Sequence, residues 1–271
     1  MKSLRWPVTV GLIIVLAFCG ALIFKKYSLS LKIGSGSITS ASGLSNQARE
    51  LEAKSNFYAA KSAYQKLINE FPNSSEVTAW QKKAEELNIK LLFSTAITPG
   101  SVLYEIKPGD SVVKIAREFK TTPELIMKSN GLTSEKIFPG KKIKVWNAPF
   151  SILVDKSQNA LVVKSNEEII KTYSVSTGAN NSTPVGTFKI VNKLPHPTWF
   201  PKGAVVPPGS PENVLGSRWL GLDLAGYGIH GTIEPQSLGK QVTQGCVRMS
   251  NSDVEELYIF IPTGTEVTIV D

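Results

Sequence analysis

Cysteine and histidine are both scarce in this chain of 271 residues, which holds two of each. Cys19 lies in an apolar run near the start and Cys246 lies close to the other end, so Cys246 has no plausible disulfide partner. The two histidines, His196 and His230, lie far from any cluster of cysteine or carboxylate residues. The sequence therefore predicts no disulfide framework, no metal site and no cofactor.

Long basic stripes interleaved with aromatic residues are also lacking. The net charge is +8 and the isoelectric point is near 9.3, but the lysines and arginines are scattered, as in residues 141–144. This pattern argues against nucleic acid as a partner and favours an acidic polymer or lipid headgroups. The hydrophobic content of 42% and the charged content of 19% are those of an ordinary globular protein, and the length allows one to three domains.

Charge is absent from residues 7–24, which form a continuous apolar run. At 1.5 Å per residue the run is just long enough to cross a bilayer core of about 30 Å. Lys25 and Lys26 follow it directly, and no small-x-small cleavage site closes it. We therefore expect an uncleaved signal anchor over residues 1–27, with a cleaved signal peptide as the alternative.

Serine and glycine dominate residues 28–44, which predicts a flexible linker. Apolar residues then recur at helical spacing over residues 45–95, with an interruption between Pro72 and Glu76, which predicts an α-helical hairpin. The hairpin is similar to one tetratricopeptide unit. Because one such unit rarely buries its own apolar face, we expect it to contact the next domain, a second copy or a protein partner; a plain helical spacer is the alternative.

Short β-type segments recur over residues 149–271 and predict an all-β sandwich or barrel. Ser157 to Asn159 reads as a hairpin turn. One helix is expected near residues 252–260, where Ser252 and Glu255 have the spacing of a capping box. Residues 195–217 form a loop dense in proline and glycine, in which His196 is a loop residue and Trp199 and Phe200 are candidates to line a groove.

Residues 102–146 resemble a LysM domain. Tyr104 to Ser111 matches its opening strand and turn, Leu125 to Leu132 matches its second helix and exit, and Ile137 to Val145 matches its closing turn and strand. Pro108-Gly109-Asp110 is strong turn chemistry, and Asp110 or Ser111 can cap the helix that follows. The resemblance implies a small βααβ fold that binds N-acetylglucosamine-containing glycans, including peptidoglycan, unless the domain is only a spacer. The expected glycan contacts are Gly109, Asp110, Ser111, Asn130, Gly131 and Leu132.

The C-terminal part resembles the catalytic domain of the L,D-transpeptidases, the YkuD-type domain. His230-Gly231 and the run from Thr243 to Arg248, Thr-Gln-Gly-Cys-Val-Arg, match the family's catalytic signature, and Thr183 to Phe188 matches another of its stretches. Gln244 stands where relatives commonly have histidine or lysine, which puts substrate preference in doubt. The resemblance implies a mainly β catalytic domain over residues 149–271, a YkuD-type sandwich or barrel, preceded by the βααβ LysM domain and the α-helical hairpin.

A cysteine and a histidine are the minimum equipment for thiol-based acyl transfer. The resemblance assigns catalytic roles to Cys246, His230, Gly245 and Arg248. Further substrate contacts are expected from Gly231, Thr232, Thr243, Gln244, Trp199 and Phe200. Arg248 can lower the thiol pKa or hold a substrate carboxylate, a backbone carbonyl is expected to orient the imidazole, and N–H groups near Gly245 and Cys246 are expected to stabilise the oxyanion.

The implied reaction releases terminal D-Ala from a tetrapeptide stem of peptidoglycan and joins the acyl group to an amine, giving a 3→3 cross-link. Two alternatives stay open: hydrolysis of the same bond, which is L,D-carboxypeptidase activity, and a non-catalytic scaffold that binds the wall through LysM. The implied substrate places the protein outside the cytoplasmic membrane, in the periplasm or cell wall, with the anchor as its membrane contact.

Overall fold

The computed structural model of the chain describes residues 40–271, which divide into two compact units, the first ending at Leu87 and the second beginning at Asn88. The predicted anchor and most of the predicted linker lie outside the described residues. Within residues 40–271, no helix is both long and apolar enough to span a bilayer.

The first unit is built from helices α2 (Ala41–Ala53), α3 (Phe57–Glu70) and the larger part of α4 (Val77–Leu92). Ser40 caps α2 by accepting a hydrogen bond from the Gly43 N–H at 3.2 Å. Their inward faces form one apolar core, which includes Leu44, Ala48, Ala60, Tyr64, Leu67, Trp80 and Leu87.

Two details of the predicted hairpin are wrong. The first helix begins at Ala41, inside the stretch predicted as linker, because Ser40 supplies a cap that the serine-rich composition hid. The predicted first helix is in fact two helices. Ser55 has φ of 57°, which ends α2, and Asn56 caps α3 by accepting from the Ala59 N–H, so the apolar spacing continues across a break in the backbone.

The second unit opens with the predicted βααβ element. Strand β1 (Ser101–Glu105) pairs antiparallel with β2 (Lys142–Trp146), and α5 (Val112–Glu118) and α6 (Pro123–Ser129) lie between them in sequence. Ser111 caps α5, as one of the two predicted candidates, and Thr122 caps α6. Ile106, Val112, Ile115, Ile126 and Val145 are among the residues of its small core.

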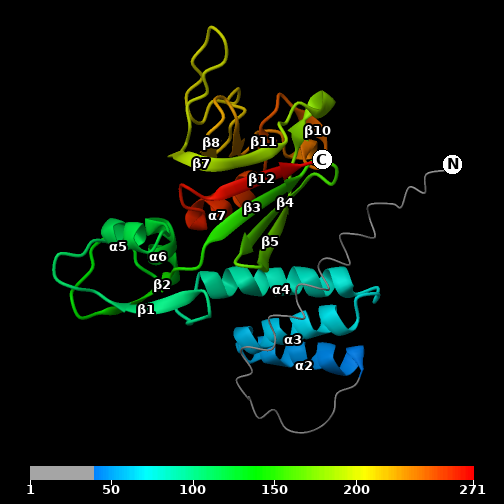
Figure 1. The fold of residues 1–271 in the computed structure, drawn as a ribbon, viewed down its shortest axis with the longest axis vertical. Coiled ribbons are helices and arrows are strands. Elements are labelled where there is room, and N and C mark those ends of the chain that lie inside the picture. Colours follow the sequence, from blue (N-terminus) through cyan, green and yellow to red (C-terminus); the bar gives the residue numbers. More distant parts are fainter. Residues whose placement is uncertain (1–39) are drawn as a thin grey trace, which may run out of the picture. The chain divides into compact units, whose positions relative to one another are not determined.

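A curled, mixed sheet of eight strands follows, in the order β11-β9-β8-β7-β12-β3-β4-β5 (Figure 1). Pairs β12–β3 and β11–β9 are parallel and the other five are antiparallel. The strands are β3 (Phe150–Asp155), β4 (Ala160–Ser165), β5 (Glu168–Ser174), β7 (Gly186–Pro195), β8 (Arg218–Leu222), β9 (Gly228–His230), β11 (Val247–Arg248) and β12 (Glu266–Val270). The sheet is a half-barrel, which confirms the predicted fold class.

A pair of short strands and one helix complete this domain. Strands β6 (Thr177–Gly178) and β10 (Gln241–Thr243) pair in parallel, and helix α7 (Asn251–Phe260) packs Val254, Leu257 and Phe260 into the core. The hairpin between β3 and β4 is confirmed, with Asn159 at a φ of 49°. The predicted capping box is wrong: the cap is Ser250, which accepts from the Asp253 N–H at 3.0 Å, two residues ahead of Ser252.

Candidate functional site

The sheet register gathers the candidate catalytic residues on one face. In the parallel pair β9–β11, His230 lies opposite Arg248 and Ile229 lies opposite Val247. Side chains alternate along a strand, so His230 and Arg248 share a face of the sheet, and Cys246 precedes Arg248 by two positions. The structure therefore places Cys246 at the entrance of β11, next to the strand that carries His230.

His230 is buried, with 4% of its surface exposed. Its Nδ1 lies 2.7 Å from the carbonyl oxygen of Gly231, which confirms the expectation that a backbone carbonyl orients the imidazole. With the proton on Nδ1 donated to that carbonyl, Nε2 is the nitrogen able to accept a proton. Burial lowers the pKa of His230 to about 4, the bond to Gly231 opposes the shift, and the Arg248 charge adds to it. At neutral pH the imidazole is uncharged.

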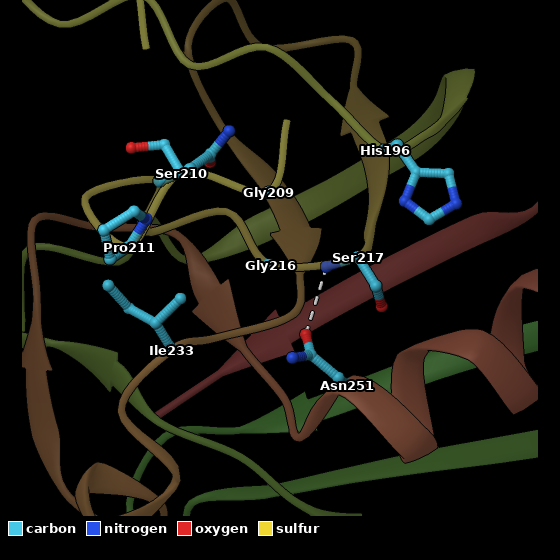
Figure 2. Close-up of a pocket in the computed structure, with 9 residues that line it drawn as sticks. His196, Gly209, Ser210, Pro211, Gly216, Ser217, Ile233 and Asn251 are labelled. Atoms are coloured by element: carbon cyan, nitrogen blue, oxygen red, sulfur yellow. Dashed lines mark hydrogen bonds between the residues drawn. The ribbon is translucent and has the colours of Figure 1, made fainter. Parts of the chain in front are cut away.

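The peptide that holds the imidazole is itself held by Asn251, the first residue of α7. Asn251 Oδ1 accepts the N–H of Ser217 at 3.1 Å (Figure 2). It also accepts the N–H of Thr232 at 3.1 Å, and its Nδ2 donates to the Thr232 carbonyl at 2.9 Å. The N–H of the Gly231–Thr232 peptide thus bonds Asn251 while the carbonyl of the same peptide bonds His230. A Cβ on Gly231 would lie 2.2 Å from Asn251 Oδ1, so this position requires glycine.

Thr243 shapes the turn that presents Cys246. Its hydroxyl donates to the Cys246 carbonyl at 2.7 Å and accepts the Gly245 N–H at 3.2 Å. Gly245 has φ of 132°, and a Cβ there would meet the Tyr227 ring at 2.7 Å. Gly245 is therefore required for conformation and for space. Its N–H is occupied by Thr243, which leaves the Cys246 N–H as the donor of this turn for an oxyanion.

Cys246 is a free cysteine of intermediate exposure. Its thiol donates to the carbonyl of Gly226 at 3.5 Å, and not to the imidazole of His230. Burial raises the pKa of the Cys246 thiol, and a backbone hydrogen bond from Gly228 and the Arg248 charge offset part of the rise. Thiol and imidazole are therefore both neutral at pH 7, which suits proton transfer to the histidine during attack rather than a preformed ion pair.

Arg248 is anchored within the protein. Its Nη1 donates to Glu234 Oε2 at 2.8 Å and to Ser237 Oγ at 3.0 Å, and 11% of its side chain is exposed. Of the two roles predicted for Arg248, its effect on the thiol pKa agrees with this geometry. Because Glu234 already neutralises the guanidinium, a role in holding a substrate carboxylate would first require that pair to open.

The remaining predicted substrate contacts divide by exposure. Gly231, Thr232 and Thr243 are buried, and their polar groups form hydrogen bonds within the protein. The Thr232 hydroxyl, for example, accepts a hydrogen bond from the Glu234 N–H. Gln244 and Phe200 are exposed, Phe200 at 72%. Trp199 forms a bridge with Val206 that closes the loop projecting between β7 and β8 (Figure 1). Gln244 and this loop are thus the predicted residues that a substrate can reach.

A cavity of about 280 Å³ lies beneath that loop (Figure 2). It is lined by His196, Gly209, Ser210, Pro211, Asn213, Gly216, Ser217, Ile233 and Asn251. Trp199 and Phe200 are not among its lining residues, so the expectation that they line a substrate groove stays a prediction. His196 follows β7 directly, with φ of 49°, and lines the cavity as a loop residue.

The predicted glycan contacts lie at two turns of the βααβ domain, and several of their side chains hold those turns together. Asp110 accepts the Lys107 N–H at 2.8 Å and the Tyr104 hydroxyl at 2.9 Å, which lowers the pKa of Asp110. Asn130 bonds both the N–H and the carbonyl of Lys144, each at 2.8 Å. Gly109 and Gly131 have positive φ, and Ser111 caps α5. Leu132 follows Gly131 in the second turn. Over residues 40–271, the structure brings no three metal-ligating side chains together.

A half-barrel sheet presents a free cysteine near a buried, carbonyl-bound histidine, the two groups that thiol acyl transfer requires. Comparison with known proteins agrees. Residues 149–269 match the YkuD family, described as the L,D-transpeptidase catalytic domain, and residues 104–146 match the LysM domain.

Three relatives are informative. YkuD of Bacillus licheniformis, a candidate L,D-transpeptidase, is 35% identical over 176 residues, which are 62% of this chain and 98% of the relative. YkuD of Bacillus subtilis is 34% identical over 173 residues, 61% of this chain and 97% of its own. YqjB of Bacillus subtilis is 41% identical over 126 residues, 44% of this chain and 70% of its own. The chain belongs to the YkuD family of L,D-transpeptidases, with a peptidoglycan-binding LysM domain ahead of the catalytic domain.

Asn251 and Trp219, which contact the Gly231–Thr232 peptide and the His230 ring, were not predicted from the sequence. Asn251 reads as an ordinary residue at a helix start, and Trp219 as an apolar residue of a strand. Their roles depend on pairings between β8, β9 and α7 that local patterns do not contain. The signal that could have found Trp219 is the pair Gly221 and Gly228, two glycines that each stand beside an apolar β-branched or leucine residue near it in sequence.

Proposed function

We propose that this protein is a peptidoglycan L,D-transpeptidase that uses Cys246 as its nucleophile and His230 as its general base. The observation that carries the proposal is the placement of Cys246 beside β9, where His230 is buried, uncharged and fixed through Nδ1 on the Gly231 carbonyl. Nε2 then has the lone pair that the thiol proton needs. The thiol turns from the Gly226 carbonyl to the imidazole when substrate binds, since hydrogen bonds of free enzymes often tighten only in the complex.

In the acylation step the Cys246 sulfur attacks the carbonyl of the third stem residue, and its proton passes to His230. The N–H of Cys246 donates to the oxyanion. The C–N bond to D-Ala then breaks, the protonated imidazole returns its proton to the leaving amine, and a thioester remains on Cys246. The low pKa of His230 favours this second proton transfer, because a buried imidazolium is a strong acid.

In the second step an amine of another stem attacks the thioester and His230 takes the amine proton. The C–S bond then breaks, His230 returns the proton to the Cys246 sulfur, and the product is a 3→3 cross-link. Water in place of the amine gives a tripeptide, which is L,D-carboxypeptidase activity. The exposed Gln244 next to the nucleophile turn is the residue that we expect to influence the choice of substrate, since it carries no charge where relatives commonly carry a basic group.

The LysM domain and the N-terminal segments are consistent with an enzyme that acts on the cell wall. The LysM domain holds the enzyme on glycan, which raises the local concentration of stems without any further contact to them. Because the side chains of Asp110 and Asn130 already bond the protein, we expect glycan contacts there to use backbone groups. We propose an extracytoplasmic location, with the apolar run of residues 7–24 as an uncleaved anchor and the three-helix unit as a candidate surface for a protein partner.

The test is mass spectrometry of disaccharide-tetrapeptide muropeptides incubated with the protein and, in parallel, with Cys246→Ala. Loss of D-Ala with a cross-linked dimer, both absent in the variant, supports the transpeptidase. Loss of D-Ala with tripeptide alone replaces it by a carboxypeptidase. Unchanged substrate over several stem chemistries contradicts both and leaves a wall-binding scaffold.

A further inference from the structure

Trp219 lies against the imidazole of the candidate general base. In the antiparallel pair β8–β9, Trp219 is directly opposite His230, so the two side chains share the face of the sheet that carries the site. Their ring centroids are 6.0 Å apart and their planes are inclined by 20°, an offset stack. One flank of the buried imidazole is therefore covered by an indole.

Two glycines make room for that indole. Gly221 follows Trp219 by two positions and pairs with Gly228 on β9, so both lie on the same face as the rings. A Cβ on Gly228 would come within 2.6 Å of Trp219 Cζ2, and a Cβ on Gly221 within 2.7 Å of Nε1. Since side chains at either position would displace the indole, the two glycines hold it flat on the sheet.

Asn192 fixes the far edge of the indole. The register between β7 and β8 shifts between Ile190 and Asn192, and Asn192 then lies opposite Gly221. From there its Oδ1 accepts the indole Nε1–H at 3.0 Å. The ring is thus held by stacking at one end and by a hydrogen bond at the other, which restricts the rotation of Trp219 about both side-chain dihedrals.

The indole also reaches the neighbourhood of the nucleophile. Gly228, which lies under the indole, forms the backbone hydrogen bond that lowers the pKa of the Cys246 thiol. The same indole therefore lies against the imidazole of His230 and against Gly228, whose backbone bonds the thiol. We propose that Trp219 is a positioning residue of the Cys246–His230 pair, whose indole fixes the plane of the imidazole and keeps water from that flank.

The catalytic meaning of this inference rests on the proposed function, but its structural content does not. Burial is the largest cause of the low pKa of His230, and the indole supplies part of that burial. Among the described residues, Arg248 is the charged group that acts on the imidazole. It projects from β11, and its charge is balanced by Glu234. Removing the indole leaves this charge pair in place. The removal therefore changes the pKa of His230 by letting water reach the imidazole.

The experiment is an NMR titration of the histidine ring protons in the full chain, with detergent for its apolar N-terminal run. The chain has two histidines, so a His196→Gln variant assigns both signals. In Trp219→Leu we expect the titration midpoint of His230 to rise by about one unit or more, because water then reaches the imidazole. The dependence of Cys246 alkylation by iodoacetamide on pH should shift with it.

Trp146→Leu is the matched control. Trp146 also stacks on a ring, that of Phe150 at 5.6 Å, and also donates its indole N–H, to the Ala148 carbonyl at 2.9 Å. Its loss should lower stability and leave the His230 midpoint unchanged. If Trp219→Leu does not fold, Trp219→Phe and Asn192→Ala replace it, and both should raise the midpoint by a smaller amount.

An unchanged midpoint in the folded Trp219 variants overturns the inference, as does an equal rise in Trp146→Leu. Because the titration needs no substrate, the two proposals can fail separately. A raised midpoint in an enzyme without muropeptide turnover contradicts the proposed function alone. Turnover by the wild-type protein, with a midpoint that no Trp219 variant moves, contradicts the positioning role alone.

Discussion

At the scale of single residues, the two central groups of the candidate site are uncharged at neutral pH. Burial lowers the pKa of His230 to about 4 and raises the pKa of the Cys246 thiol. A neutral imidazole with its proton on Nδ1 can accept the thiol proton at neutral pH, and the imidazolium formed is acidic enough to give the proton to the departing amine. The proposed mechanism therefore uses His230 as a general base rather than a preformed thiolate.

The buried histidine makes stability depend on pH. Its pKa is about 4 in the folded protein and near the ordinary 6.5 in the unfolded chain, so the unfolded chain binds more protons between these values. The free energy of unfolding should therefore fall as the pH drops from 6.5 to 4, by about 3 kcal/mol from this group. Urea titrations at several pH values should show this decline in the wild-type protein and a smaller one in His230→Gln. Equal declines would contradict the assignment.

Asn251 should matter for activity beyond its share of stability. In Asn251→Ala the buried Thr232 N–H loses its acceptor, which costs about 1–3 kcal/mol, and the carbonyl that orients His230 is no longer fixed. We expect kcat to fall by about 10²-fold, the size of effect that a small misplacement of a catalytic group can have.

Asn213→Ala provides the comparison for Asn251→Ala. Asn213 also bonds several backbone groups, among them the Pro197 carbonyl and the Leu215 N–H, but it does not contact the Gly231–Thr232 peptide. The free energy of unfolding of Asn213→Ala should fall to a similar extent, and its kcat should stay unchanged. A similar loss of kcat in both variants would mean that Asn251 acts only through the stability of the loop.

At the scale of elements, helix α7, which follows β11, is positioned by its first turn. Ser250 accepts the Asp253 N–H at 3.0 Å and donates to the Asp253 carboxylate at 2.7 Å, so α7 begins where Asn251 can reach the peptide beside His230. The cap thus couples a helix start to the geometry of the site.

The position of the cap can be tested with two neighbouring serines. Ser250→Ala should lower the free energy of unfolding by about 1 kcal/mol, the usual effect of removing an N-cap. Ser252→Ala, at the position that the sequence pattern favoured, should change it by only a few tenths of that amount, because Ser252 is inside the helix. Thermal or urea denaturation measures both. A larger effect at Ser252 would move the cap to the predicted position.

The sequence predicted much of the element order and missed details that depend on local geometry. The βααβ domain and the β3–β4 hairpin follow from turn residues with strong conformational preferences. The capping box failed because Ser250 and Ser252 both precede acidic residues at suitable spacing, and the pattern does not choose between them. The break between α2 and α3 was missed because the apolar spacing continues through Lys54–Asn56, where Ser55 adopts positive φ.

At the scale of the whole molecule, the proposed functions, glycan binding and acyl transfer, belong to different domains. Residues 104–146 match LysM and residues 149–269 match the catalytic domain. The motifs around Cys246 and His230 were enough to predict the catalytic domain, because they are short runs of sequence that match the family signature. Trp219 and Asn251 could not be predicted in the same way, since they approach His230 and Thr232 only through the folding of the sheet and α7.

This division predicts that a soluble glycan competes with peptidoglycan for the LysM domain and does not affect the turnover of a stem peptide in the catalytic domain. Oligomers of N-acetylglucosamine should displace the protein from insoluble peptidoglycan in a sedimentation assay, because they occupy LysM. They should leave the turnover of a tetrapeptide stem without sugar unchanged. Inhibition of that turnover would place glycan binding in the catalytic domain, and failure to displace the protein would make the LysM domain a spacer.

The most direct test of the account is intact-mass spectrometry of the protein after acid quenching of its reaction with a tetrapeptide stem. The account predicts an adduct with the mass of the acylated tripeptide portion, located at Cys246 by peptide mapping, and no adduct in Cys246→Ala or His230→Gln. An adduct that persists in Cys246→Ala, or undiminished release of D-Ala by that variant, would contradict the assignment of Cys246 as the nucleophile.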